Sequence, residues 1–252
     1  MAKANGYVLY EGPSQIDGQP IVVIATGFAK GSSNEKTGAG LIQTWIIRSD
    51  VKPTDAVNTG DDASICGDCP HRGAIVDGRN VGRSCYVTVF QAPLNVFKTY
   101  RKGGYERAED LAALGAGRGV RLGSYGDPAA VPMHVWEAFC SLSAYRTGYT
   151  HQWRSAPLEL ATYCMASADT AADKAAAKLL GYRTFRVRHE SEPLETHEIV
   201  CPASKEAGYR TTCDACKACG GLGAKAKVDI AIMAHGAASK VNAFKSRLQP
   251  SA

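Results

Sequence analysis

Cysteine spacing is the most restrictive feature of this sequence. A triple, Cys213-Asp-Ala-Cys216-Lys-Ala-Cys219, follows the dipeptide Cys201-Pro202. Two-residue spacers let successive thiolates turn toward one compact centre, and a cysteine followed by proline recurs at clusters of the bacterial ferredoxin type. The pattern therefore predicts that Cys201, Cys213, Cys216 and Cys219 together hold a metal centre, and an iron–sulfur cluster of the [4Fe-4S] type is the first interpretation.

Two other interpretations of these four cysteines stay open. A tetrahedral Zn²⁺ ion also takes four thiolates, although zinc modules usually present them as two separated pairs. The thiols could also be redox-active or free. A disulfide framework is not expected, because the nine cysteines are odd in number and the N-terminus lacks the apolar segment of a signal peptide. We therefore expect a cytoplasmic protein whose clustered cysteines bind metal.

A second cysteine group lies earlier in the chain, where Cys66-Gly-Asp-Cys69-Pro-His71 precedes Cys85. Three thiolates leave a metal site one ligand short. His71 could complete a Cys₃His zinc site, or a cluster could keep an open iron of the kind that binds S-adenosylmethionine. Alternatively, the CxxC segment is a turn and Cys85 is a buried strand residue.

Hydrophobic periodicity predicts an α/β fold. Two apolar runs rich in β-branched residues, Ile21–Thr26 and Thr44–Ile47, indicate strands, and a third strand is expected at Tyr86–Phe90. Strands and helices then alternate, with strands expected at Gly119–Gly123, Gly148–Trp153, Leu158–Met165, Thr184–Val187, His197–Val200 and Val228–Ala234, and helices at Pro132–Tyr145, Ala168–Leu180 and Ala237–Leu248.

This alternation favours a mainly parallel sheet with outer helices, either open or closing toward an incomplete (β/α) barrel. We expect one domain over residues 1–252, with metal-binding loops at about 60–85 and 201–223. The two remaining cysteines, Cys140 and Cys164, lie in apolar segments and are assigned to the core.

Three further residues are catalytic candidates because functional side chains collect at the carboxyl ends of parallel strands. Arg121 and Asp127 belong to a segment that ends in a Gly-Asp-Pro turn, and His151 belongs to Gly-Tyr-Thr-His-Gln-Trp. Equally, Asp127 could cap the following helix and His151 could be structural. No G-x-S-x-G elbow, P-loop or H-E-x-x-H motif is present. Whether the chain is an enzyme is left open.

The charge pattern says little about partners. The formal net charge is +5, and basic residues alternate with acidic ones except in a short run at Arg183, Arg186 and Arg188. A basic stripe with interleaved aromatic residues, which is typical of nucleic-acid binding, is absent from the sequence. Nucleic acid is therefore a weakly supported partner. No apolar run approaches membrane-spanning length, so no membrane partner is expected.

Taken together, the CxxCPHR segment at Cys66–Arg72, the Gly126-Asp127-Pro128 turn, the GYTHxW segment at Gly148–Trp153 and the CP…CxxCxxC pattern resemble a family of uncharacterised tailed-bacteriophage proteins. The resemblance covers about residues 20 to 248. It implies a phage-encoded protein that acts in the cytoplasm of an infected bacterium, with a host or phage protein as a possible partner. It implies no particular activity.

A weaker resemblance, in strand order and in the cysteine-lined mouth, is to radical S-adenosylmethionine enzymes of barrel type. Those enzymes hold their cluster with C-x₃-C-x₂-C, whereas this chain has C-x₂-C with a distant third cysteine. The resemblance implies a radical enzyme in which Cys66, Cys69 and Cys85 hold the cluster and Asp127, His151 or Arg121 positions the substrate.

Overall fold

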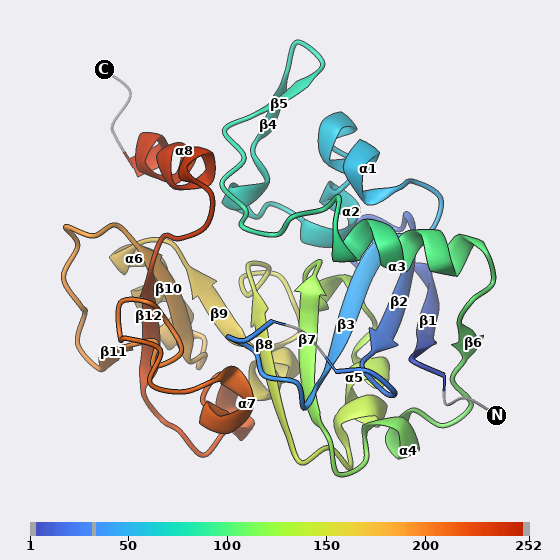
Figure 1. Cartoon of the computed structure of the whole chain (residues 1–252). Helices are drawn as coiled ribbons and strands as arrows, with labels where there is room; N and C mark the ends of the chain where they lie inside the picture. The colour runs from blue at the N-terminus through green and yellow to red at the C-terminus, as the bar shows by residue number, and fades with distance from the viewer. Residues whose placement is uncertain (1–3, 32–33, 249–252) are drawn as a thin grey trace.

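The computed structural model describes residues 4–31 and 34–248, and Figure 1 shows the chain. Within this part of the chain, ten strands form one sheet and two more form a small hairpin. The sheet strands are β1 (Gly6–Pro13), β2 (Pro20–Thr26), β3 (Leu41–Arg48), β6 (Glu106–Arg107), β7 (Gly119–Tyr125), β8 (Tyr145–Thr150), β9 (Met165–Ala168), β10 (Thr184–Arg188), β11 (Glu198–Val200) and β12 (Asp229–Met233). The hairpin pairs β4 (Ala74–Val76) with β5 (Arg79–Val81).

Helices are short and lie between the strands. The α-helices are α1 (Pro53–Thr59), α2 (Ala63–Cys66), α3 (Ala92–Arg101), α4 (Leu111–Gly115), α5 (Met133–Cys140), α6 (Ala171–Leu179), α7 (Cys213–Cys216) and α8 (Ala238–Leu248). Single 3₁₀ turns are η1 (Pro70–Arg72), η2 (Pro128–Ala130), η3 (Leu158–Thr162) and η4 (Gly221–Gly223). In Figure 1, α1, α2, α8 and the hairpin lie above the edge toward which the arrows of β7 and β9 point.

The strand order in the sheet is β11-β12-β10-β9-β8-β7-β3-β2-β1-β6. Only the β1–β2 and β2–β3 pairs are antiparallel. The prediction of an α/β fold with a large, mainly parallel sheet is therefore confirmed. The incomplete barrel is not confirmed, because the strand order starts at β11 and ends at β6, and these two strands do not pair with each other.

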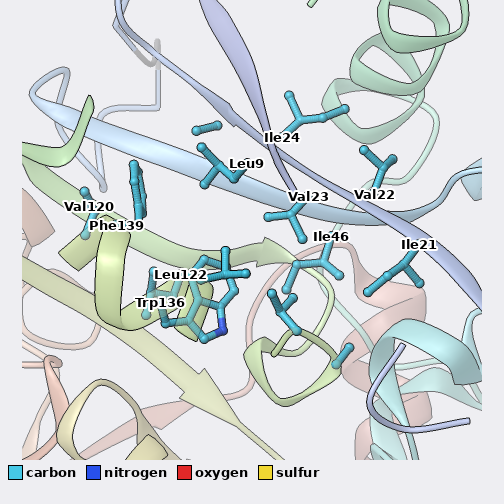
Figure 2. Close-up of a cluster of buried hydrophobic side chains, with 14 of the residues drawn as sticks. Leu9, Ile21, Val22, Val23, Ile24, Ile46, Val120, Leu122, Trp136 and Phe139 are labelled. Carbon is cyan, nitrogen blue, oxygen red and sulfur yellow. The ribbon is translucent and has the colours of Figure 1, made fainter. Parts of the chain in front are cut away.

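The main hydrophobic core lies around β2 and α5 (Figure 2). Every residue from Ile21 to Ala25 is fully buried. A continuous apolar run of this kind is typical of a strand that is covered on both faces. Trp136 and Phe139 of α5 are also fully buried, and they complete the core. The predicted strands at Ile21–Thr26 and Thr44–Ile47 are confirmed as β2 and part of β3.

Two predicted strands are wrong. Tyr86–Phe90 forms no strand, and the side chains of Tyr86 and Phe90 are exposed. In the segment Leu158–Met165, Pro157 precedes the 3₁₀ turn η3, and the strand β9 starts only at Met165. A short apolar run does not distinguish a strand from a helical turn by periodicity alone, which explains the second error.

Other boundaries shift by a few residues. The helix expected over Pro132–Tyr145 ends at Cys140, and Tyr145 instead begins β8. The helix expected over Ala168–Leu180 begins at Ala171, because the Thr170 hydroxyl accepts the N–H of Asp173 and caps it there. The expected loop at 60–85 contains α2, η1 and the β4–β5 hairpin.

Candidate metal centre

One cavity of about 410 Å³ contains both cysteine groups in its lining. The lining includes Cys66, Cys69, Cys85, Cys201, Cys213, Cys216 and Cys219. The catalytic candidates Arg121, Asp127 and His151 line the same cavity. Cys140 and Cys164 do not. They are 3% and 0% exposed and belong to the hydrophobic core, as expected.

The four cysteines of the first group come from two segments that meet at the sheet. Cys201 directly follows β11, and its N–H donates to the Ala231 carbonyl oxygen at 2.8 Å. Cys213 and Cys216 are the first and last residues of α7, which the Thr212 hydroxyl caps. The Cys213 N–H donates to the Lys36 carbonyl oxygen at 2.9 Å. The backbone thus fixes α7 against the 34–37 turn.

Cys219 lies beside the part of β8 that does not pair with β9. β8 pairs with β7 through residues 145–148, but with β9 only through residues 149–150. On the unpaired side of β8, the Gly148 N–H donates to the Cys219 carbonyl oxygen at 3.0 Å. The cysteine loop therefore takes the place of a neighbouring strand along the first half of β8.

The loop after Cys219 is held tightly. Gly221 has a φ of 59°, and a Cβ there would collide with the carbonyl oxygen of Ala161, so only glycine fits. The Arg183 guanidinium is buried and donates to the carbonyl oxygens of Ala218 (2.8 Å) and Gly221 (3.0 Å).

Electrostatics couple the thiols of this group. The pKa of Cys219 is raised to about 12, chiefly by burial and also by the neighbouring Cys201, Cys213 and Cys216, although a hydrogen bond with the Tyr149 hydroxyl acts in the opposite direction. Four thiolates at this spacing repel one another, so a cation between them would stabilise the ionised form. Metal binding would then release protons.

Two cationic side chains accompany these thiols. The charges of Cys213 and Cys219 act to raise the pKa of both Lys36 and Arg121. Burial lowers the pKa of Lys36, and the nearby thiols oppose that shift. Arg121 also donates to the Tyr86 hydroxyl at 3.1 Å, from the segment that follows Cys85. Arg121 therefore lies between the two cysteine groups.

The second group is built on the segment before and after the hairpin. Cys66 ends α2, and the Cys69 N–H donates to the Cys66 carbonyl oxygen at 3.2 Å. Across the hairpin, the Cys85 N–H donates to the His71 carbonyl oxygen at 2.9 Å. Burial raises the pKa of Cys66 well above its usual value, and the charges of Cys69 and Cys85 add to this effect. The three thiols therefore lie close enough to influence one another's ionisation.

His71 turns away from these cysteines. Its Nε2 atom lies 2.8 Å from Asp169 Oδ1, and its Nδ1 atom lies 2.8 Å from Ser84 Oγ. His151 Nε2 lies 3.5 Å from the other Asp169 oxygen. In the described residues, His71, His151 and Asp169 are the one group of His, Cys, Asp or Glu whose ligand atoms all lie within 4.8 Å of one another.

Asp169 was not among the sequence candidates. It directly follows β9, a position that the strand-end argument would have selected, but the strand expected there ended at Met165. Because the predicted strand ended too early, Asp169 was not recognised as a strand-end residue.

Asp127 acts on the backbone. Its Oδ1 accepts the Ala129 N–H at 3.0 Å and caps η2, while its Oδ2 accepts the His151 N–H at 2.7 Å. These contacts support the capping interpretation of Asp127. Burial raises its pKa, and the backbone donors oppose that shift.

The basic run is also structural. The side chains of Arg183, Arg186 and Arg188 are 3%, 1% and 7% exposed. Arg186 pairs with Glu198, and Arg188 pairs with Glu206. These guanidinium groups therefore contribute no basic surface.

No described helix is both long and apolar enough to cross a membrane. Comparison of the chain with models of known protein families, with curated proteins and with solved structures gave no match.

Proposed function

We propose that this chain is an iron–sulfur protein in which Cys201, Cys213, Cys216 and Cys219 hold a [4Fe-4S] cluster. One observation carries the proposal: four cysteines from two separated segments line a single cavity and belong to one apolar cluster. This cluster contains the side chains of Met165, Ile230 and Ile232. Apolar surroundings of this kind suit an iron–sulfur cluster, because burial and hydrogen bonds to sulfur tune its reduction potential.

The spacing of the cysteines in the sequence favours a cluster over a single zinc ion. Zinc modules usually present four thiolates as two separated pairs. Here one cysteine precedes a triple with two-residue spacers, a pattern closer to that of bacterial ferredoxin clusters.

The surroundings suggest a role in electron transfer or in binding a ligand beside the cluster. Lys36, Arg121 and the Tyr149 hydroxyl would offset the negative charge of the thiolates. The cavity of about 410 Å³ has the size of a small-molecule pocket. From the resemblance in the cysteine and GYTHxW motifs, we place this role in a phage protein that acts in the cytoplasm of an infected bacterium.

The test is anaerobic purification and cluster reconstitution. We expect a brown protein whose first site contributes about four iron and four sulfide per chain. Cys213→Ser and Cys216→Ser should lose that iron. Cys140→Ala and Cys164→Ala are matched controls, because these cysteines lie in the core and not in the cavity. A colourless wild-type protein with one stoichiometric zinc would contradict the proposal and favour a structural zinc module.

A second function is favoured by one observation at the other cysteine group. Because His71 engages Asp169 and Ser84, it does not complete a Cys₃His site with Cys66, Cys69 and Cys85, and the histidine that interacts with the Cys69 thiol is His151. A cluster held by three thiolates keeps an open iron, which radical S-adenosylmethionine chemistry requires. Reductive cleavage of S-adenosylmethionine by wild-type protein, and none by Cys66→Ser, would establish this function. Reconstituted protein without cleavage would exclude it.

A further inference from the structure

Three side chains from distant segments converge beside the cavity. His71 comes from η1, His151 follows β8, and Asp169 follows β9. Asp169 receives one imidazole on each oxygen, at 2.8 Å from His71 and 3.5 Å from His151. The two imidazole rings lie 5.4 Å apart, centre to centre, and are tilted 66° to each other. Both histidines line the cavity.

Two imidazoles and one carboxylate are a recurrent ligand set for divalent transition metals. They bind zinc in hydrolytic sites and ferrous iron in oxygen-activating sites. Metal–ligand bonds of about 2.0–2.2 Å place neighbouring ligand atoms roughly 3–3.5 Å apart. Two of the three ligand pairs already have such distances, and the third is within 4.8 Å. A small rotation of the imidazole rings would bring the ring nitrogens of His71 and His151 to the same distance.

Hydrogen bonds outside the proposed site orient the His71 ring and fix the backbone of His151. Metal-bound histidines usually bond their second ring nitrogen to a neighbouring polar group. His71 does this through Nδ1 and Ser84 Oγ at 2.8 Å, which leaves Nε2 for coordination. The backbone of His151 is fixed by Asp127. His151 Nε2 is buried and makes no close hydrogen bond, since Asp169 Oδ2 lies 3.5 Å away and the Cys69 thiol is its other polar neighbour. A buried nitrogen without a close partner calls for an explanation, and a metal ion bound together with Asp169 supplies one.

A cationic side chain of α8 also reaches this point. Arg247 Nη2 lies 3.6 Å from Asp169 Oδ1, and its guanidinium stacks on Phe244, which in turn stacks on His71. Arg247 therefore offsets part of the Asp169 charge in the absence of a metal ion. A divalent cation would compete with it, because like charges repel across a few ångströms. Removal of Arg247 should tighten metal binding.

We propose that His71, His151 and Asp169 form a mononuclear site for a divalent transition-metal ion, zinc or ferrous iron. The site shares no ligand with the four-cysteine cluster, so it stands or falls independently of the proposed function. Its histidine face is turned to the cavity, where a ligand or water could complete the coordination.

The test is an anaerobic titration of the reconstituted protein with Co²⁺, followed by competition with Zn²⁺ and Fe²⁺. We expect one equivalent of Co²⁺ that gives weak visible bands and lacks the intense thiolate charge-transfer band. Asp169→Asn and His151→Gln should weaken this binding by at least 10- to 100-fold. Arg247→Ala should strengthen it. His134→Gln, on the exposed side of α5, is the matched control and should bind as wild type does. The competing ion with the lower dissociation constant identifies the preferred metal.

Three results would overturn the inference. One is Co²⁺ binding that survives both Asp169→Asn and His151→Gln. Another is a bound equivalent with strong thiolate bands that disappears in Cys69→Ser, since this would assign the metal to the cysteines. Absence of binding in folded wild-type protein would also overturn it, and would leave the three residues as a hydrogen-bonded His–Asp–His arrangement. If Asp169→Asn fails to fold, His71→Gln replaces it.

Discussion

The Asp127 carboxylate accepts the backbone N–H of His151 at 2.7 Å and so ties the carboxyl end of β7 to that of β8. The second oxygen of the carboxylate caps η2. Asp127 lines the cavity, yet both its oxygens are occupied by backbone donors. Its place in the site is therefore to position His151.

Replacement of Asp127 by alanine should have two effects. The loss of two buried backbone partners should cost about 1–3 kcal/mol of unfolding free energy, because the freed N–H groups stay desolvated. Co²⁺ binding at the His71–His151–Asp169 site should also weaken. Urea denaturation at an unchanged m-value and Co²⁺ titration measure the two effects.

Asp110→Ala is the control for this variant. Asp110 is exposed and caps helix α4 with a single bond from the Ala113 N–H, so its loss should cost only about 0.5–2 kcal/mol. Metal affinity should stay as in wild type. If Asp127→Ala kept full Co²⁺ affinity, Asp127 would be a cap with no effect on His151.

The sequence predicted those parts of the site that depend on local spacing. Cys213, Cys216 and Cys219 are close in the chain, and Cys201 ends a recognisable strand. Asp169 could not be found in this way, because its role depends on His71 and His151, which lie in distant segments. Only the pairing of β8 with β9 places Asp169 beside His151.

The run of arginines at 183, 186 and 188 shows a second limit of prediction from the sequence. In β10 the buried positions carry Thr184, Arg186 and Arg188, and the half-buried ones carry Phe185 and Val187. A period-two pattern read by hydrophobicity would place the aromatic side inward and the arginines outward. The carboxylates that make arginine burial possible lie in later segments, so sequence periodicity could not assign the inner face.

The buried Arg186–Glu198 pair should be essential for stability. Arg186 donates from Nε and Nη2 to the two Glu198 oxygens at 2.9 and 2.8 Å, and both side chains are almost fully buried. Glu198→Ala removes both charged hydrogen bonds of the buried guanidinium, leaves it only the more distant Glu192 carboxylate at 3.6 Å, and should cost about 3–5 kcal/mol. Because β11 ends directly before Cys201, the variant should also retain less iron. Thermal or urea unfolding and iron analysis measure this.

Two variants test whether the effect belongs to the pair. The double variant Arg186→Met/Glu198→Leu replaces both charges and should recover most of the lost stability. Glu190→Ala removes an exposed partner of Lys245 and should leave the unfolding free energy nearly unchanged, because solvent screens such a pair. An equal loss for Glu190→Ala and Glu198→Ala would show that burial of the pair is unimportant.

The same pair predicts a dependence of stability on pH. Burial alone would raise the pKa of Glu198, but the hydrogen bonds from Arg186 outweigh it and lower the pKa below the usual value of 4.5. A carboxylate with a lowered pKa in the folded state stabilises the protein above its unfolded pKa, and this contribution is lost as the pH falls through the folded pKa. Unfolding free energy should therefore decline below about pH 4.5.

Glu198→Gln should flatten part of this acid decline, since glutamine does not titrate. Urea denaturation of wild type and variant at pH values from neutral down to strongly acidic gives the two slopes. Parallel slopes would mean that other carboxyl groups carry the whole effect.

Tyr149 should tune the reduction potential of the proposed cluster. Its hydroxyl hydrogen-bonds Cys219, and burial raises the pKa of Tyr149 well above its usual value, so the hydroxyl remains a donor at neutral pH. A donor to sulfur stabilises the more negative, reduced cluster. Tyr149→Phe removes this donor with little change in shape, and it should lower the potential while iron content stays constant. A redox titration followed by electron paramagnetic resonance measures the shift.

Tyr163→Phe is the control, because the Tyr163 ring stacks with Arg146 and is absent from the cavity lining. Equal potentials for wild type and Tyr149→Phe would show that the hydroxyl does not act on the cluster, and the charges of Lys36 and Arg121 would then be the remaining candidates for setting its potential.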